Sequence, residues 1–189
     1  MNEKPIWDYL SAKIRNPYGV AGLMGNLYAE SSLNPVNGNN VKKKTGLTDE
    51  EYTAVADANR NDNFATDGIA YGLCQWCYHT RKLALLKMAR EQGKSVGDLT
   101  LQLDYLWYEL NQYKTVLNTL YSAKSVKEAS DIVMLKYERP VNTSDAAKDK
   151  RCQYGMKYFQ MFSENITAKL SKKSAKELLV KLDNALKRK

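Results

Sequence analysis

The chain has 189 residues and a formal net charge of +8, from 29 lysines and arginines against 21 aspartates and glutamates. This length suits one domain with its own hydrophobic core and leaves room for a short appendage. The single histidine, His79, excludes a multi-histidine metal site and leaves carboxylates and carboxamides as the candidate reactive groups.

The N-terminal stretch is mixed and polar, so we expect no signal peptide and a protein made in the bacterial cytoplasm. No apolar run approaches the length of about 18 residues that a membrane span needs. Three cysteines, an odd number, do not indicate a disulfide-rich scaffold.

Helical spacing dominates the first 35 residues. Ile6, Leu10 and Ile14 lie four residues apart, which predicts an amphipathic helix that ends near Pro17. A second apolar helix is predicted over 20–31, and it ends before Pro35 because the residue before a proline disfavours the helical region.

The segment 36–70 differs, because it is polar and rich in turn residues. Thr48 followed by Glu51 is a capping pattern that predicts a short helix. The remainder is predicted to be a small irregular or β-hairpin lobe, and lobes of this kind inside a compact domain are often functional.

Helical patterns then return to the end of the domain. We expect helices over 80–91, 99–117, 126–137 and 146–162, the third stopped by Pro140 and the last capped by Thr143, Ser144 and Asp145. The pattern predicts a mainly α protein.

The last stretch, 163–189, carries +5 of the total charge of +8. Its leucines include a helical stripe, so we expect a basic amphipathic helix, a tail or linker attached to a domain over 1–162.

Glu30 is the first candidate reactive residue. It lies at the end of an apolar helix, where the negative end of the helix dipole and apolar neighbours disfavour its ionised form. A carboxyl group that holds a proton is what general acid catalysis requires. The alternative is an ordinary solvated glutamate at a helix end.

The segment 67–76 is the second candidate. Its glycines allow tight turns, and Gln75 can both donate and accept hydrogen bonds to a sugar or amide. Aromatic side chains with polar edges that are candidates to line a cleft are Tyr71, Trp76, Tyr78 and Tyr137. The alternative is a glycine-rich hairpin with core aromatics.

Cys74 and Cys77 form a C-x-x-C pair beside His79, with Cys152 far along the chain. The residue types would allow either a redox pair or a zinc site. The strand-rich context of redox motifs is missing, however, and the fourth zinc ligand would be remote in the sequence. We expect small buried hydrophobic side chains, no metal and no cofactor.

The order of these motifs resembles that of the phage tail lysozyme family, peptidoglycan muramidases of the lysozyme-like superfamily. The matching stretches are Gly25–Ser31, Tyr71–Trp76 with Arg81, Gln102–Leu110, Tyr137–Pro140 and a final helix with Arg151 and Tyr158. The resemblance implies a helical fold of the goose-type and lytic-transglycosylase-like kind. One departure is that cysteines flank Gln75-Trp76, where family members commonly have a small residue and a threonine.

The resemblance also implies roles. Glu30 would protonate the glycosidic oxygen between N-acetylmuramic acid and N-acetylglucosamine, and Asp67 would be the catalytic base, with Asp62 as the alternate. Gln75 and Tyr71 match positions that line the sugar cleft. Hydrolysis with inversion is the first expectation, and attack by the substrate's own 6-hydroxyl, as in lytic transglycosylases, is the second.

Other function classes stay open at this point. A non-catalytic wall-binding or structural tail component is one, and nucleic-acid binding through the basic tail is another, although the tail lacks interleaved aromatic residues. We expect bacterial peptidoglycan as the partner, with anionic wall polymers bound by the tail and no nucleic acid. Delivery by a holin or on a phage tail is expected by analogy.

Overall fold

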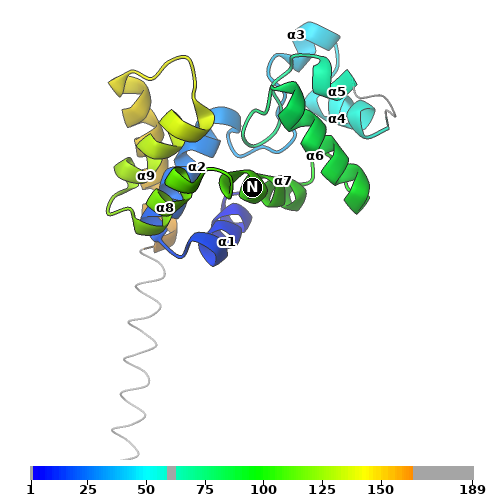
Figure 1. Cartoon of the computed structure of the whole chain (residues 1–189). Helices are drawn as coiled ribbons and strands as arrows, with labels where there is room; N and C mark the ends of the chain where they lie inside the picture. The colour runs from blue at the N-terminus through cyan, green and yellow to red at the C-terminus, as the bar shows by residue number, and fades with distance from the viewer. Residues whose placement is uncertain (1, 59–62, 164–189) are drawn as a thin grey trace, which may run out of the picture.

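The structure is a computed structural model, which describes residues 2–58 and 63–163. The described residues form helices and turns with no β-strand, so the predicted mainly α fold is confirmed. Figure 1 shows a larger helical body and a smaller lobe at the upper right, with α7 running beneath and between them. The body contains α1 (Glu3–Ile14), α2 (Pro17–Ser31), α8 (Lys114–Ser122), α9 (Val126–Val133) and a final helix over 145–163.

Helix α2 runs through the core of the body. Asn16 caps its start by accepting a hydrogen bond from the Tyr18 N–H, and Pro17 occupies the first turn, where its missing N–H costs nothing. Gly22 allows α9 to approach closely, because a Cβ there would lie 2.5 Å from the Cβ of Ala129. The helix ends where Ser32 adopts a left-handed conformation, and this places Glu30 in its last turn.

The small lobe is more helical than the sequence pattern indicates. It holds α3 (Val41–Thr45), α4 (Asp49–Ala58) and α5 (Asn63–Thr66), beside α6 (His79–Gln92). The predicted cap of α4 is confirmed, since Thr48 Oγ1 accepts from the Glu51 N–H and Glu51 Oε2 accepts from the Thr48 N–H. In place of a hairpin the described lobe has two isolated bridges, in which Tyr71 pairs with Gly38 and with Trp76.

The single helix predicted over 99–117 is wrong. The structure has α7 (Leu99–Leu110) and α8 (Lys114–Ser122), separated by a turn. The Asn111 amide donates to the Trp107 carbonyl at 2.7 Å, and the Gln112 N–H bonds the Glu109 carbonyl three residues back. Such local bonds satisfy the last carbonyls of α7 and end it.

The end of the domain packs back onto its beginning. After α9 comes the π-helical turn η1 (Met134–Glu138), which ends where Arg139 is left-handed, just before Pro140. The final helix begins at 145, with the Ser144 hydroxyl accepting from the Ala147 N–H, as the predicted cap requires. Its Phe159 ring stacks against Tyr18, and its Phe162 ring lies tilted against Trp7. The predicted basic helix falls, from residue 164 on, outside the described residues.

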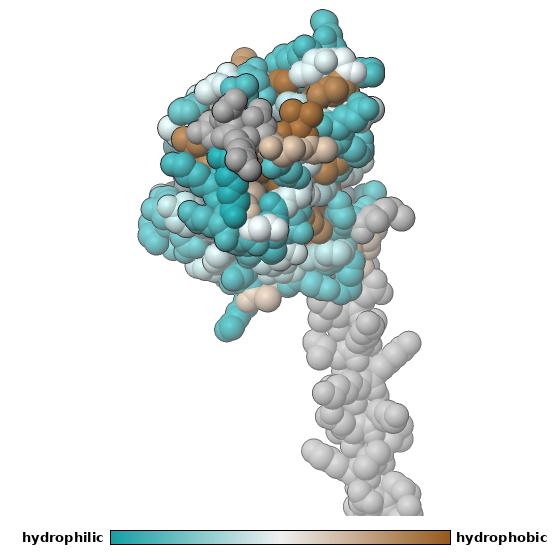
Figure 2. All heavy atoms as spheres, turned by 90° about the vertical axis from the view of Figure 1, so that its right-hand side faces the viewer, coloured by the Kyte–Doolittle hydropathy of each residue, from teal (hydrophilic) through white to brown (hydrophobic). Residues whose placement is uncertain are grey.

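Most of the surface visible in Figure 2 is hydrophilic, and apolar side chains gather on its upper part, over the small lobe. None of the helices that the structure describes is both long and apolar enough to cross a membrane.

Candidate active site

A polar cleft of about 620 Å³ lies where body and lobe meet. One side comes from α2 and from the chain around η1, and the other from the loop 37–39, the segment 70–78 and α6. The lining side chains that the chemistry uses are Glu30, Asn37, Asn39, Gln75, Tyr78, Arg81, Tyr137 and Glu138. The structure therefore brings four of the predicted site residues, Glu30, Gln75, Tyr78 and Tyr137, to one cleft.

Glu30 is held by an arginine from the other end of the chain. Arg151 Nη2 donates to Glu30 Oε1 at 2.6 Å, and the two side chains are only 19% and 11% exposed for Glu30 and Arg151. Arg151 Nη1 also donates to Asn26 Oδ1 at 3.2 Å, and Asn26 is fully buried and bonded to Ser130. Asn26 and Glu30 lie four residues apart, on one face of α2, so both point to the same arginine.

The same docking explains Gly25. A Cβ at this position would lie 2.6 Å from the backbone nitrogen of Gly155 in the final helix. The two glycines thus let α2 and the final helix approach closely enough for Arg151 to reach Glu30. The Gly25–Ser31 motif therefore has two roles. It allows α2 to pack closely against the final helix, and it contains the Glu30 carboxyl group.

A buried carboxylate, Glu109 of α7, connects the two sides of the cleft. It accepts two hydrogen bonds from Arg81, at 2.6 and 2.7 Å, one from Trp76 Nε1 at 2.7 Å and one from the Tyr137 hydroxyl at 2.6 Å. Burial alone would raise the pKa of Glu109, but these donors and the charge of Arg81 outweigh it and lower the pKa. Glu109 thus stays ionised and fixes Arg81 and Tyr137, which line the cleft, and the buried Trp76 behind them.

Two predicted cleft aromatics do not line the cleft. Trp76 and Tyr71 are both fully buried, and the Tyr71 hydroxyl is bonded to Thr53 Oγ1 at 2.6 Å. A sugar in the cleft cannot reach either ring without rearrangement of the core. Tyr78, by contrast, is 69% exposed at the cleft. Sequence alone did not separate the exposed aromatic from the buried ones, because all lie in one short segment.

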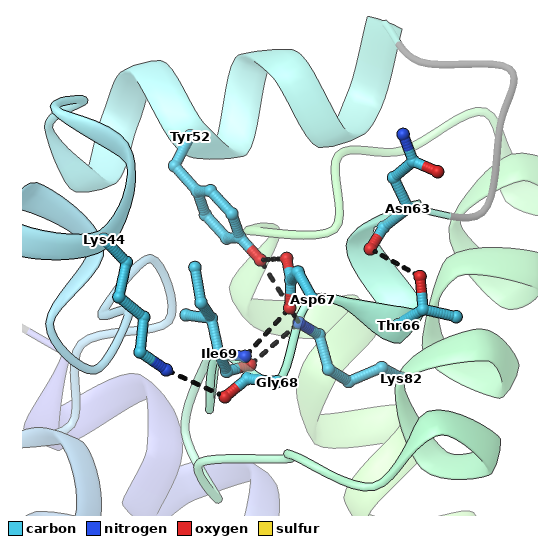
Figure 3. A network of polar contacts seen from close by, with 8 residues as sticks. All are labelled: Lys44, Tyr52, Asn63, Thr66, Asp67, Gly68, Ile69 and Lys82. Carbon is cyan, nitrogen blue, oxygen red and sulfur yellow. Dashed lines mark hydrogen bonds and ion pairs between the residues drawn. The ribbon is translucent and has the colours of Figure 1, made fainter.

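Asp67 does not line this cleft. Figure 3 shows its carboxylate inside the small lobe, where Lys82 Nζ donates to Oδ1 at 2.6 Å, the Tyr52 hydroxyl to Oδ2 at 2.5 Å and the Ile69 N–H to Oδ1 at 2.9 Å. Lys82 is fully buried; burial lowers its pKa, and Asp67 opposes that shift. Its role as a catalytic base stays a prediction, and Asp62, the alternate, lies outside the described residues.

The cysteines do not gather around the histidine. Cys74 is buried and Cys77 exposed, both are free thiols, and His79 is an exposed residue at the start of α6. Across residues 2–58 and 63–163, no group of three or more histidine, cysteine, aspartate or glutamate side chains is arranged to hold a metal ion.

Two charged residues near Glu30 had no role in the sequence prediction: Glu138 lines the cleft, and Arg151 bonds Glu30 without lining the cleft itself. Glu138 and Arg151 both belong to stretches that carried the family resemblance, but nothing in the sequence indicates that they meet Glu30. The only local signal is that Glu138 lies at the end of a predicted helix, as Glu30 does.

A helical fold with a carboxyl group from the last turn of a core helix, facing a polar cleft between body and lobe, is of the lysozyme-like class. The family model described as phage tail lysozyme matches residues 1–162. The chain belongs to this family, and the family points to a peptidoglycan-degrading role.

Proposed function

We propose that this protein cleaves the glycan strands of bacterial peptidoglycan at the bond between N-acetylmuramic acid and N-acetylglucosamine, with Glu30 as the general acid. The observation that carries the proposal is the Glu30 carboxyl group, fixed by Arg151 at 2.6 Å in a cleft of about 620 Å³. That volume is within the range of about 300–1,000 Å³ typical of ligand pockets.

The lining of the cleft supports a carbohydrate substrate. Amide side chains of Asn37, Asn39 and Gln75 can bond hydroxyl and acetamido groups, and exposed Tyr78 offers a ring face for stacking. Gln75 is left-handed, and its side-chain nitrogen donates to the Asn37 and Gly72 carbonyls, so its position is fixed before substrate arrives. A fixed polar side chain loses little conformational entropy on binding.

The second candidate is a lytic transglycosylase that leaves an anhydro end. It gains support from the location of Asp67, which lies outside the cleft and is engaged by Lys82 and Tyr52. If Asp67 does not act as a base at the substrate, the 6-hydroxyl of the muramyl unit can attack instead of water. Both candidates need the same acid.

The test is digestion of purified peptidoglycan by the wild type and by Glu30→Gln, which keeps the shape and removes the proton. We expect the variant to lose at least about 100-fold in rate, since positioned general acids contribute about 10²–10⁴-fold. Glu91→Gln, the same change at an exposed site on α6, is the matched control and should keep full activity. Mass spectrometry of the products then distinguishes reducing ends from anhydro ends.

A wild type that leaves walls from several bacteria intact would instead support a non-catalytic tail component. A fully active Glu30→Gln would remove Glu30 from the role of general acid. Within the proposal, the enzyme is a phage or mobile-element wall lysin, released by a holin or carried on a phage tail. The basic tail then holds it on anionic wall polymers, without nucleic acid.

A further inference from the structure

Glu138 lines the cleft and has one buried carboxyl oxygen. It is the last residue of η1 and lines the same cleft as Glu30. Among the residues that the structure describes, its Oε1 is buried and has no hydrogen-bond partner. A buried ionised oxygen without a donor is costly, whereas a neutral carboxyl group tolerates such a place.

The charges that face Glu138 come from four elements. Glu30 of α2 and Glu109 of α7 are negative, while Arg81 of α6 and Arg151 of the final helix are positive. Each arginine is already paired with a different carboxylate, Arg81 with Glu109 and Arg151 with Glu30. Burial first, and then the charge of Glu30, raise the pKa of Glu138 well above its ordinary value.

Two other titratable groups against Glu138 carry no charge near neutral pH. They are the thiol of Cys74 and the phenol of Tyr137, and burial raises the pKa of both well above their ordinary values. Neither group therefore offers Glu138 a compensating positive charge. Arg139, the next residue in the chain, also lines the cleft, but within the described part of the chain its side chain forms no hydrogen bond or ion pair with Glu138.

We propose that Glu30 and Glu138 act as a carboxyl pair that is coupled through charge and carries one proton in total, and that Glu138 thereby keeps a proton in the cleft for Glu30 to deliver. This inference rests on the proposed function and deepens it. In the empty cleft the proton lies on Glu138, because Arg151 engages Glu30. Glu138 is a positioning residue, since it acts through Glu30 and not on the sugar.

In one turnover the pair gives up one proton and regains one. The pair gives its proton to the glycosidic oxygen as the bond from C1 to that oxygen breaks, and the bonding electrons stay on the oxygen. The oxygen of a water molecule, or the 6-hydroxyl, then bonds to C1. The proton that this nucleophile loses returns to the pair, which again holds one proton.

The pair also sets the alkaline limit of activity. Removal of its last proton would leave two neighbouring negative charges, so the pair keeps that proton to a higher pH than a lone carboxyl group would. Without Glu138, the active fraction of Glu30 should fall at a lower pH.

The test is a pH profile of kcat/KM on peptidoglycan for the wild type, Glu138→Gln and the control Glu91→Gln, all as full-length chains. We expect the alkaline limb of Glu138→Gln to move at least about one unit to lower pH, which lowers its activity about tenfold at neutral pH. At acidic pH its activity should return to within about threefold of wild type. Glu91→Gln should follow the wild type throughout.

Two results would overturn the pair. One is an unchanged rate for Glu138→Gln, and the other is a rate reduced by the same factor at every pH, which indicates a purely structural role. A wild type without any activity on walls refutes the proposed function instead.

A second readout does not depend on catalysis. The folded pKa of Glu138 lies above the unfolded one, so the stability that its proton contributes is present below about pH 4.3 and is lost as pH rises through the folded pKa. Glu138→Gln mimics the neutral form, so it does not lose this stability as pH rises. We therefore expect its melting temperature to rise relative to wild type as pH increases, and a pH-independent difference would contradict the shared proton.

Discussion

At the scale of single residues, Lys82 depends on one carboxylate. Its side chain is fully buried among Phe64, Tyr52 and Asp67, and Asp67 is the only acidic side chain with which it forms an ion pair among the described residues. The Asp67 side chain is itself 24% exposed. Removal of one partner from a buried pair leaves an uncompensated charge, which is far more costly than loss of a surface pair.

We therefore expect Asp67→Asn to lower the free energy of unfolding by about 3 kcal/mol. For a domain of this size that is a fall in melting temperature of roughly 6–12 °C, measurable by circular dichroism. Asp149→Asn, which breaks the exposed pair with Lys127, is the control and should cost about 1 kcal/mol or less. Equal costs for the two variants would contradict the importance of the buried pair.

The same variant tests the predicted catalytic role of Asp67. Its activity should be measured at a temperature at which the variant is fully folded. A role as catalytic base requires a further loss of orders of magnitude there, while activity close to wild type removes Asp67 from the mechanism.

At the scale of elements, the crossing of α2 with the final helix controls the cleft. Gly25 and Gly155 meet at this crossing, and Arg151 lies one turn before Gly155. Protein interiors are close-packed, so an added methyl group at the crossing must push one helix away. Such a shift separates Arg151 from Glu30.

Gly25→Ala should therefore destabilise the fold by about 1–3 kcal/mol and reduce wall cleavage about tenfold or more in the folded protein. Ala54→Ser adds one atom at an exposed site on α4 and should change neither property. Denaturant unfolding and the peptidoglycan assay measure the two effects. A Gly25→Ala variant with normal stability would contradict this prediction, because it would show that the two helices accommodate a methyl group at their crossing.

The elements also show what sequence can and cannot predict. Periodicity and caps predicted most helices, and the Thr48 cap is confirmed in both of its hydrogen bonds. The break after Leu110 was missed, because it depends on a side-chain amide that bonds its own helix, not on proline or glycine. Sequence periodicity does not show where a side chain competes with the backbone for a helix's last carbonyl groups.

The candidate site was predicted only in part, for a different reason. Glu30 and Gln75 carry local signals. Arg151, by contrast, is defined by its bond to Glu30, 121 positions away, and Glu138 by lining the same cleft as Glu30. Tyr71 and Trp76 share their segment with Tyr78, but only the fold decides which ring faces the solvent.

At the scale of the whole molecule, charge is unevenly placed. Residues 163–189 carry +5 of the +8. The end of the described chain packs onto its beginning, since the Phe162 ring contacts that of Trp7 and the Ser163 hydroxyl bonds the Phe159 carbonyl, and we predict that the domain ends there. The proposed partner, a wall bearing anionic polymers, attracts positive charge in a salt-dependent way.

We expect a chain that ends at Ser163 to fold, to cleave soluble glycan fragments at the wild-type rate, and to bind walls less at low salt. A full-length variant with glutamine at Lys172, Lys173, Lys176 and Lys181 keeps the length and removes charge, and should bind as weakly as the truncation. Sedimentation with purified walls at low and high salt measures both. Unfolding of the truncated chain would place the tail in the core and contradict the expectation.

The pairing of Glu30 with Arg151 also determines when a newly made chain becomes competent. The two residues are 121 positions apart, so a ribosome must complete most of the domain before the arginine can reach the carboxyl group. Nascent chains and fragments that stop before residue 151 contain the glutamate but not the helix that holds it. If the cleft acts as proposed, the growing chain is inactive for most of its synthesis and becomes active only when the final helix has been made and has docked.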